Sequence, residues 1–151
     1  MALLANEYAE RQNRSVMDAR EPRAILNHMT IATRVVQSAI RVLGLILLVL
    51  GFMFWSGRSY ELVPVHMRIG EILVTLLWIL AAMGLRAGVK PGLVLGAMLY
   101  GVIVVAFGMR MGTFLPGPAH EAIRVLHFLI GLGAIGLAES IGARMRRRAA
   151  K

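Results

Sequence analysis

The stretch at residues 125–140, VLHFLIGLGAIGLAES, decides the fold class. It contains GLGAIG, which matches the G-x-G-x-x-G pattern of dinucleotide-binding proteins. In those proteins the glycines form a turn between a strand and a helix, so that the pyrophosphate meets the helix N-terminus. Here the glycines lie inside a continuous apolar run, from Val125 to Ala138, that has no turn residue and no preceding strand pattern. The motif therefore does not predict NAD binding.

Composition indicates what this run is instead. The chain has 151 residues, of which 58% are hydrophobic and 17% are charged, and its mean hydropathy is +0.68. These values are more apolar than those of soluble domains. Four apolar segments, at residues 38–56, 63–85, 91–109 and 119–141, each come close to the roughly 20 residues that cross a bilayer. The sequence predicts an integral membrane protein.

The connections between these segments are short and rich in Gly and Pro, as in antiparallel helical hairpins. We therefore expect an all-α, four-helix up-and-down bundle over residues 38–142. Residues 1–37 are expected to form a short surface helix or a partly ordered tail, with a break at Glu21-Pro22. Residues 143–151 are expected to form a basic tail.

Positive charge predicts the orientation of the bundle. Basic residues precede the first segment, occupy the second connection at Arg86 and Lys90, and close the chain in RMRRRAAK. In a four-span topology these three regions share one side, which predicts cytoplasmic termini. The chain has a net charge of +9. Its basic residues flank the spans and do not form a stripe interleaved with aromatic residues, so we expect the protein to interact with the lipid bilayer and not with nucleic acid.

Several chemistries are excluded by composition. The chain has no cysteine, which rules out thiolate metal sites and covalently attached c-type haem. A metal or cofactor must be held by His, Met, carboxylates or the backbone. No set of nucleophile, base and acid can be placed together, so the sequence does not predict an enzyme acting by itself.

Two histidines share a local pattern. The second segment begins VHMRIG and the fourth contains LHFLIG, so His66 and His127 each have a glycine, Gly70 or Gly131, one turn below on the same face. Counted back from the predicted cytoplasmic ends at about 1.5 Å per residue, the two imidazoles lie at similar depth in the outer half of the bundle.

Further polar residues accompany them. In the fourth segment His120 and Arg124 lie on the same stripe as His127, because the steps between them are four and three residues. In the second segment Arg68 and Glu71 are three residues apart and can form a local ion pair, which lowers the cost of placing them near the membrane boundary.

Three hypotheses account for this cluster. In the first, His66 and His127 are the axial ligands of a b-type haem used for electron transfer, Gly70 and Gly131 make room for the macrocycle, and Arg124 or Arg68 neutralises a propionate.

In the second hypothesis the histidines, His66, His127 and His120, bind copper together with methionines near the outer ends of the spans, since imidazole and thioether suit Cu(I). In the third, the histidines are structural and the chain is a non-catalytic accessory or scaffold subunit of a membrane complex, or part of a homo-oligomer.

Glycine spacing also predicts close helix packing. Gly92 and Gly96 form a small-xxx-small pair, and we expect Gly133 and Gly136 of the GLGAIG motif to be contact points between helices.

The runs LVPVHMRIG, LLWILAA and LPGPAHEAIRVLHFLIGLGAIGLAE resemble those of small four-helix bacterial inner-membrane proteins of uncharacterised function, over about residues 44–144. The resemblance implies the fold and a multi-pass location in the bacterial inner membrane. The chain is similar to b-type cytochromes only in its paired bundle histidines. The resemblance implies neither an activity nor a ligand.

Overall fold

All the secondary structure is helical in the part of the chain that the computed structural model describes, which is the backbone of residues 2–150 and the side chains of Gln12 and residues 30–150. The elements are α1 (Ala2–Trp55), η1 (Tyr60–Leu62), α2 (Val63–Arg86), α3 (Pro91–Arg110), η2 (Met111–Thr113), η3 (Gly117–Ala119) and α4 (His120–Ala149). The chain divides into two compact units, Met1–Ala32 and Thr33–Lys151. The candidate site and the contacts between helices described below lie in the second unit.

Four helical segments are long and apolar enough to cross a membrane: Thr30–Trp55, Tyr60–Arg86, Pro91–Thr113 and Gly117–Ala149. The prediction of four apolar spans is therefore confirmed. Large apolar side chains point outward from them, including Leu45, Phe52 and Leu99, which are each more than half exposed. Such a surface is unfavourable in water and suits contact with lipid, as in a multi-pass membrane protein.

The helix ends follow from glycine and proline. Gly57 and Gly88 adopt positive φ angles of 77° and 76° directly after α1 and α2. At both ends the next amide bonds back five residues, Arg58 to Met53 and Val89 to Gly84, each at 2.9 Å. This is the Schellman arrangement, in which glycine tolerates the left-handed conformation that reverses the chain. Prolines stand in the first turns of α2 and α3, where no amide donor is needed.

Two helices are longer than predicted. The backbone of α1 is helical through Glu21 and Pro22, so the predicted break is not found. A proline removes one hydrogen bond from the helix, and the flanking Ala and Arg residues favour helix. The side chains of residues 1–11 and 13–29, on which a surface location would depend, lie outside the described ones.

The fourth helix continues to Ala149, through the residues that were expected to form a tail. Arginine is a good helix former and is favoured near a helix C-terminus by the dipole. Ile141, Gly142 and Met145 are also buried, so this part of α4 packs against its neighbours.

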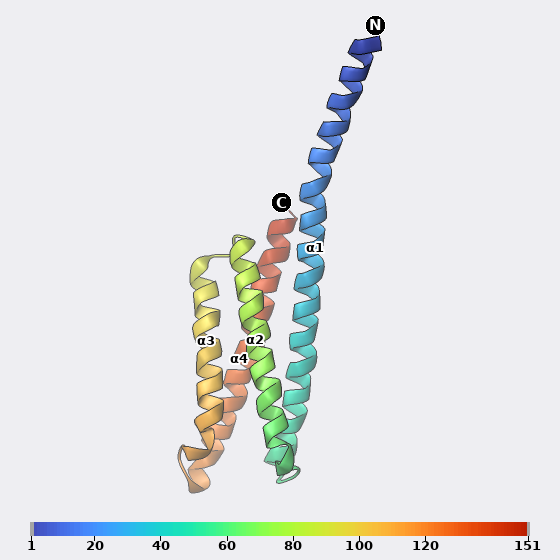
Figure 1. Cartoon of the computed structure of the whole chain (residues 1–151). Coiled ribbons are helices and arrows are strands. Elements are labelled where there is room, and N and C mark those ends of the chain that lie inside the picture. Colours follow the sequence, from blue (N-terminus) through green and yellow to red (C-terminus); the bar gives the residue numbers. More distant parts are fainter. Residues whose placement is uncertain (1, 151) are drawn as a thin grey trace. The chain divides into compact units, whose positions relative to one another are not determined.

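The helices of the second unit pack side by side (Figure 1). The core contains residues from all four helices: Ile40 of α1, Leu73, Leu77, Leu80 and Ala81 of α2, Val94 and Ala97 of α3, and Ala134, Ala138, Ile141 and Met145 of α4. The small residues Ala97, Ala134 and Ala138 are almost fully buried, because they let the helix axes approach closely.

Candidate functional site

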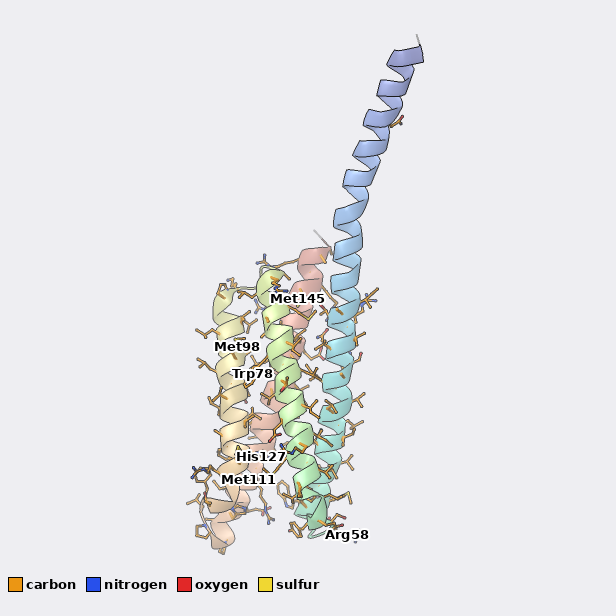
Figure 2. The ribbon with its side chains drawn as sticks, viewed as in Figure 1. Arg58, Trp78, Met98, Met111, His127 and Met145 are labelled. Atoms are coloured by element: carbon orange, nitrogen blue, oxygen red, sulfur yellow. The ribbon has the colours of Figure 1, made fainter. Side chains whose placement is uncertain are left out.

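The structure brings His66 and His127 into direct contact. His66 lies in the second turn of α2, His127 lies in the third turn of α4, and their ring centroids are 6.2 Å apart with 49° between the ring planes. Figure 2 labels His127 at the same end of the unit as Met111 and Arg58, while Met145 is at the opposite end. The two rings that we expected at similar depth therefore lie next to each other.

The Nδ1 atoms of both histidines are buried, and neither has a hydrogen-bond partner among the described residues. A buried polar atom without a partner is unfavourable and rare in proteins, and a bound ligand or ion is one of its recognised explanations. Both rings otherwise remain half-buried. The pair therefore presents nitrogen atoms that the protein itself does not use.

Aromatic rings flank the pair on both sides. Phe54 of α1 meets His66 edge-on at 5.5 Å, and Phe107 of α3 stacks on His127 at 6.1 Å with 12° between planes. Each of the four helices thus contributes one ring to an aromatic row, defined here as Phe54, His66, His127 and Phe107. The row keeps the histidines in an apolar setting and restricts their rotation.

The glycines near the pair differ in their surroundings. A Cβ atom added at Gly70 or Gly131 would meet no atom within 4 Å, so there is open space beside both residues. A Cβ atom at Gly108 would lie 3.3 Å from Cε1 of His127. Gly108 therefore lets α3 approach the His127 ring closely, whereas Gly70 and Gly131 leave room one turn below the two histidines.

The arginines of the predicted site form ion pairs within their own helices. Arg68 donates to Glu71 at 2.8 Å, and its side chain is 79% exposed. Arg124 lies 3.4 Å from Glu121 and is only 35% exposed. Arg124 is thus the less solvated and more loosely paired cation, and it remains available to a second carboxylate.

His120 is not part of the pair. Its Nδ1 lies 3.1 Å from the carbonyl oxygen of Phe114, and because a carbonyl can only accept, Nδ1 carries the proton. Together with Glu121 and Arg124, His120 lines a shallow pocket with residues of the α3–α4 connection.

Nowhere among the residues searched, which are the described ones, do three or more His, Asp or Glu side chains form a group able to hold a metal ion. The predicted set of three histidines is therefore not assembled. A copper site at this end of the unit would depend on methionine for its further ligands.

The pair offers two imidazoles from different helices to a ligand. The ring centroids of His66 and His127 lie 6.2 Å apart, a separation close to that of the Phe107–His127 ring contact at 6.1 Å. Together, the two imidazoles would be able to hold a haem iron, with no further protein ligand needed.

Several residues at the site escaped the sequence analysis. Phe54 and Phe107 lie in otherwise uniform apolar runs, so no local pattern separates them from residues that face lipid. Their role depends on which helices are neighbours, which residue spacing alone does not show. Gly108 does carry a signal, because its spacing of four residues from Gly112 predicts close helix packing, but that spacing does not identify His127 as the neighbour.

The chain was also compared with known proteins. No family model, curated protein or solved structure matches it.

Proposed function

We propose that this chain is a four-span electron-transfer protein that holds a b-type haem between His66 of α2 and His127 of α4. The observation that carries the proposal is the pair of facing imidazoles whose buried Nδ1 atoms have no partner among the described residues. In an apolar setting, two such rings from different helices are better explained as ligands than as packing residues.

The residues present fit the group in number and type. His66 and His127 would supply two imidazole ligands for a haem iron, and each has a buried Nδ1 atom without a partner among the described residues. The planar macrocycle also needs space beside the rings. Gly70 and Gly131 carry no side chain one turn below the two histidines, and they would offer little obstruction to the group once α2 and α4 moved apart to admit it.

The surrounding side chains have definite tasks in this proposal. Phe54 and Phe107 hold the two rings in place and exclude water. Arg124, loosely paired with Glu121, neutralises a propionate carboxylate, and the more exposed Arg68 offers a second cation at the same end. When bound, haem supplies a reversible one-electron couple.

The arrangement of the chain in the membrane is part of the same proposal. An up-and-down bundle with both termini in the cytoplasm of a bacterium, in the inner membrane, is supported by the concentration of basic residues at one end of the second unit. The histidine pair would then lie in the half of the membrane nearer the periplasm, and electron exchange would occur at the outer face.

The first experiment is visible spectroscopy of the full chain, purified in mild detergent after expression with added haem precursor. We expect about one low-spin haem per chain, with sharp α and β bands after dithionite reduction. His66→Ala and His127→Ala should each lose the haem, whereas His120→Ala should retain it, because His120 is bonded to Phe114.

A further variant separates ligand loss from misfolding. Since methionine also serves as an axial haem ligand, His127→Met should keep haem with a shifted spectrum and a raised potential. Haem retained in both alanine variants, or absent from the correctly folded parent protein, would overturn the proposal. Stoichiometric Cu(I) in a haem-free protein would favour the copper hypothesis, and co-purification with a larger membrane complex would favour the accessory one.

A further inference from the structure

Charge is distributed very unevenly between the two ends of the second unit. Arg148 lies against Gly88 and Arg146 donates to Gln37, so the start of the α1 span, the α2–α3 turn and the end of α4 share one end. Among the described side chains this basic end holds eight cationic residues: Arg34, Arg41, Arg86, Lys90, Arg144, Arg146, Arg147 and Arg148. It holds one carboxylate, Glu139. The opposite end has four arginines and three glutamates and is nearly balanced.

The carboxylate of the basic end is already engaged. Glu139 accepts two hydrogen bonds from the Arg41 guanidinium, at 2.7 and 2.8 Å, and a third from the side-chain amide of Gln37 at 3.2 Å. Both of its oxygens are therefore used. Among the described side chains of the basic end, no other acid is present to neutralise the remaining cations.

Three of these cations gather at the turn between α2 and α3. Arg86 and Lys90 stand two residues before and after Gly88, and a Cβ atom at Gly88 would lie 3.0 Å from Nη1 of Arg148. The Arg148 side chain thus reaches from the end of α4 to the turn. We define Arg86, Lys90 and Arg148 as the turn cluster. All three side chains are exposed, and none forms an ion pair with a described residue.

The level of the turn cluster indicates its partner. The second span ends at Arg86 and the third begins at Pro91, so the cluster lies where lipid headgroups meet the hydrocarbon core. A guanidinium binds phosphate through two parallel hydrogen bonds, and an ammonium adds a compact charge. Three uncompensated cations at this level attract a headgroup with net negative charge more strongly than a zwitterionic one.

We propose that the turn cluster is a binding site for the headgroup of one anionic phospholipid. The phosphate of the lipid would bind Arg148 of α4 together with the cations of the α2–α3 turn. The site is independent of the histidine pair, which lies at the other end of the unit. Loss of the lipid would leave haem binding intact, and loss of the haem would leave lipid binding intact.

The test is native mass spectrometry of the full chain in mild detergent, titrated with phosphatidylglycerol or with phosphatidylcholine. The first variant carries Arg86→Gln, Lys90→Gln and Arg148→Gln. A matched control carries Arg34→Gln, Arg144→Gln and Arg147→Gln, which removes the same charge from the same end but leaves the turn cluster unchanged. Unaltered elution and helical content confirm that both variants fold.

We expect the parent protein and the control to retain phosphatidylglycerol in preference to phosphatidylcholine. The turn-cluster variant should lose this affinity by about tenfold or more, given the attraction that each basic residue contributes near a membrane surface. Equal losses in the two variants would show diffuse attraction without a defined site, and equal retention of the two lipids would also overturn the proposal. Displacement of the lipid by inorganic phosphate would identify the site as one for free phosphate instead.

Discussion

Polar side chains join the helices by the same local device at three places in the second unit. In each case an N–H or O–H group donates to a backbone carbonyl of a neighbouring helix, and a glycine three or four residues after that carbonyl makes room for the donor. The pairs are Trp78 with Met98 (3.1 Å) beside Gly101, Tyr100 with Ile130 (3.0 Å) beside Gly133, and Gln37 with Ala138 (3.4 Å) beside Gly142. Figure 2 shows the first of them, with Trp78 beside Met98. Each of these glycines therefore leaves space for a hydrogen-bonded side chain and also lets the neighbouring helix approach closely.

The GLGAIG motif allows this device to be tested at two glycines that are three residues apart, Gly133 and Gly136. A Cβ atom at Gly133 would overlap the hydroxyl and ring of Tyr100, whereas one at Gly136 would meet nothing within 4 Å. Gly133→Ala should destabilise the protein by about 1–3 kcal/mol through overpacking. Gly136→Ala should be neutral, or stabilising by up to about 1 kcal/mol, because alanine is the better helix former. Thermal unfolding in detergent measures both, and equal behaviour of the two variants would contradict this account.

Glycine spacing predicted close packing but not its location. The expectation for Gly133 is confirmed by its contact with Tyr100, while Gly136, Gly92 and Gly96 have no atom near a Cβ position in the described part of the chain. A small-xxx-small spacing places two glycines on one face. It does not say whether that face meets another helix or lipid, because this depends on the arrangement of all four helices.

At the scale of the element, α1 is attached to α4 through polar contacts that surround Gln37. This side chain is 2% exposed, and its amide donates to Ala138 and Glu139 while its oxygen accepts from Arg146. The amide is thus satisfied at both ends by α4. Seven residues later in α1, Gly44 leaves space for the side chain of Ile135 of α4. The hydrogen bonds of Gln37 therefore fix the register of α1 against α4 for this apolar contact.

Replacing Gln37 with Leu should loosen α1 in particular. The substitution leaves the half-buried Arg146 without its hydrogen-bond acceptor on Gln37, which costs about 1 kcal/mol. Hydrogen exchange followed by mass spectrometry should show faster exchange in residues 33–55 than in α3. Ser38→Ala, which changes the exposed neighbouring position, is the control and should exchange like the parent. Uniformly faster exchange in all helices would argue against a specific role in holding α1.

The limits of the predicted elements also have physical reasons. The ends at Gly57 and Gly88 follow directly from residue type, because few other residues tolerate their positive φ. Hydropathy predicts that the first span begins at about residue 38, whereas the apolar helical span in the structure begins at Thr30. The structure buries Gln37 through partners in α4, about one hundred residues away. A local pattern cannot supply such a partner.

At the scale of the whole molecule, the four spans and the proximity of His66 to His127 could be anticipated from hydropathy and from counting residues along the helices. The two rings share a depth because they stand near corresponding ends of their spans. The aromatic row and the turn cluster could not be anticipated, because each combines residues from elements whose neighbours the sequence leaves open. Phe54 and Phe107 come from α1 and α3, and Arg148 reaches a turn some sixty residues earlier in the chain.

The orientation in the membrane can be tested without interference from native thiols, because the chain contains no cysteine. Ser56 and Thr113 stand at the end of the unit that holds the histidine pair, and Ala150 stands at the basic end. If the basic residues set the orientation, a membrane-impermeant maleimide should label Ser56→Cys and Thr113→Cys in cells whose outer membrane has been permeabilised. Ala150→Cys should react only after the inner membrane is opened. The opposite pattern would place the histidine pair on the cytoplasmic side and the turn cluster in the outer leaflet, and would reverse the side on which the proposed haem exchanges electrons.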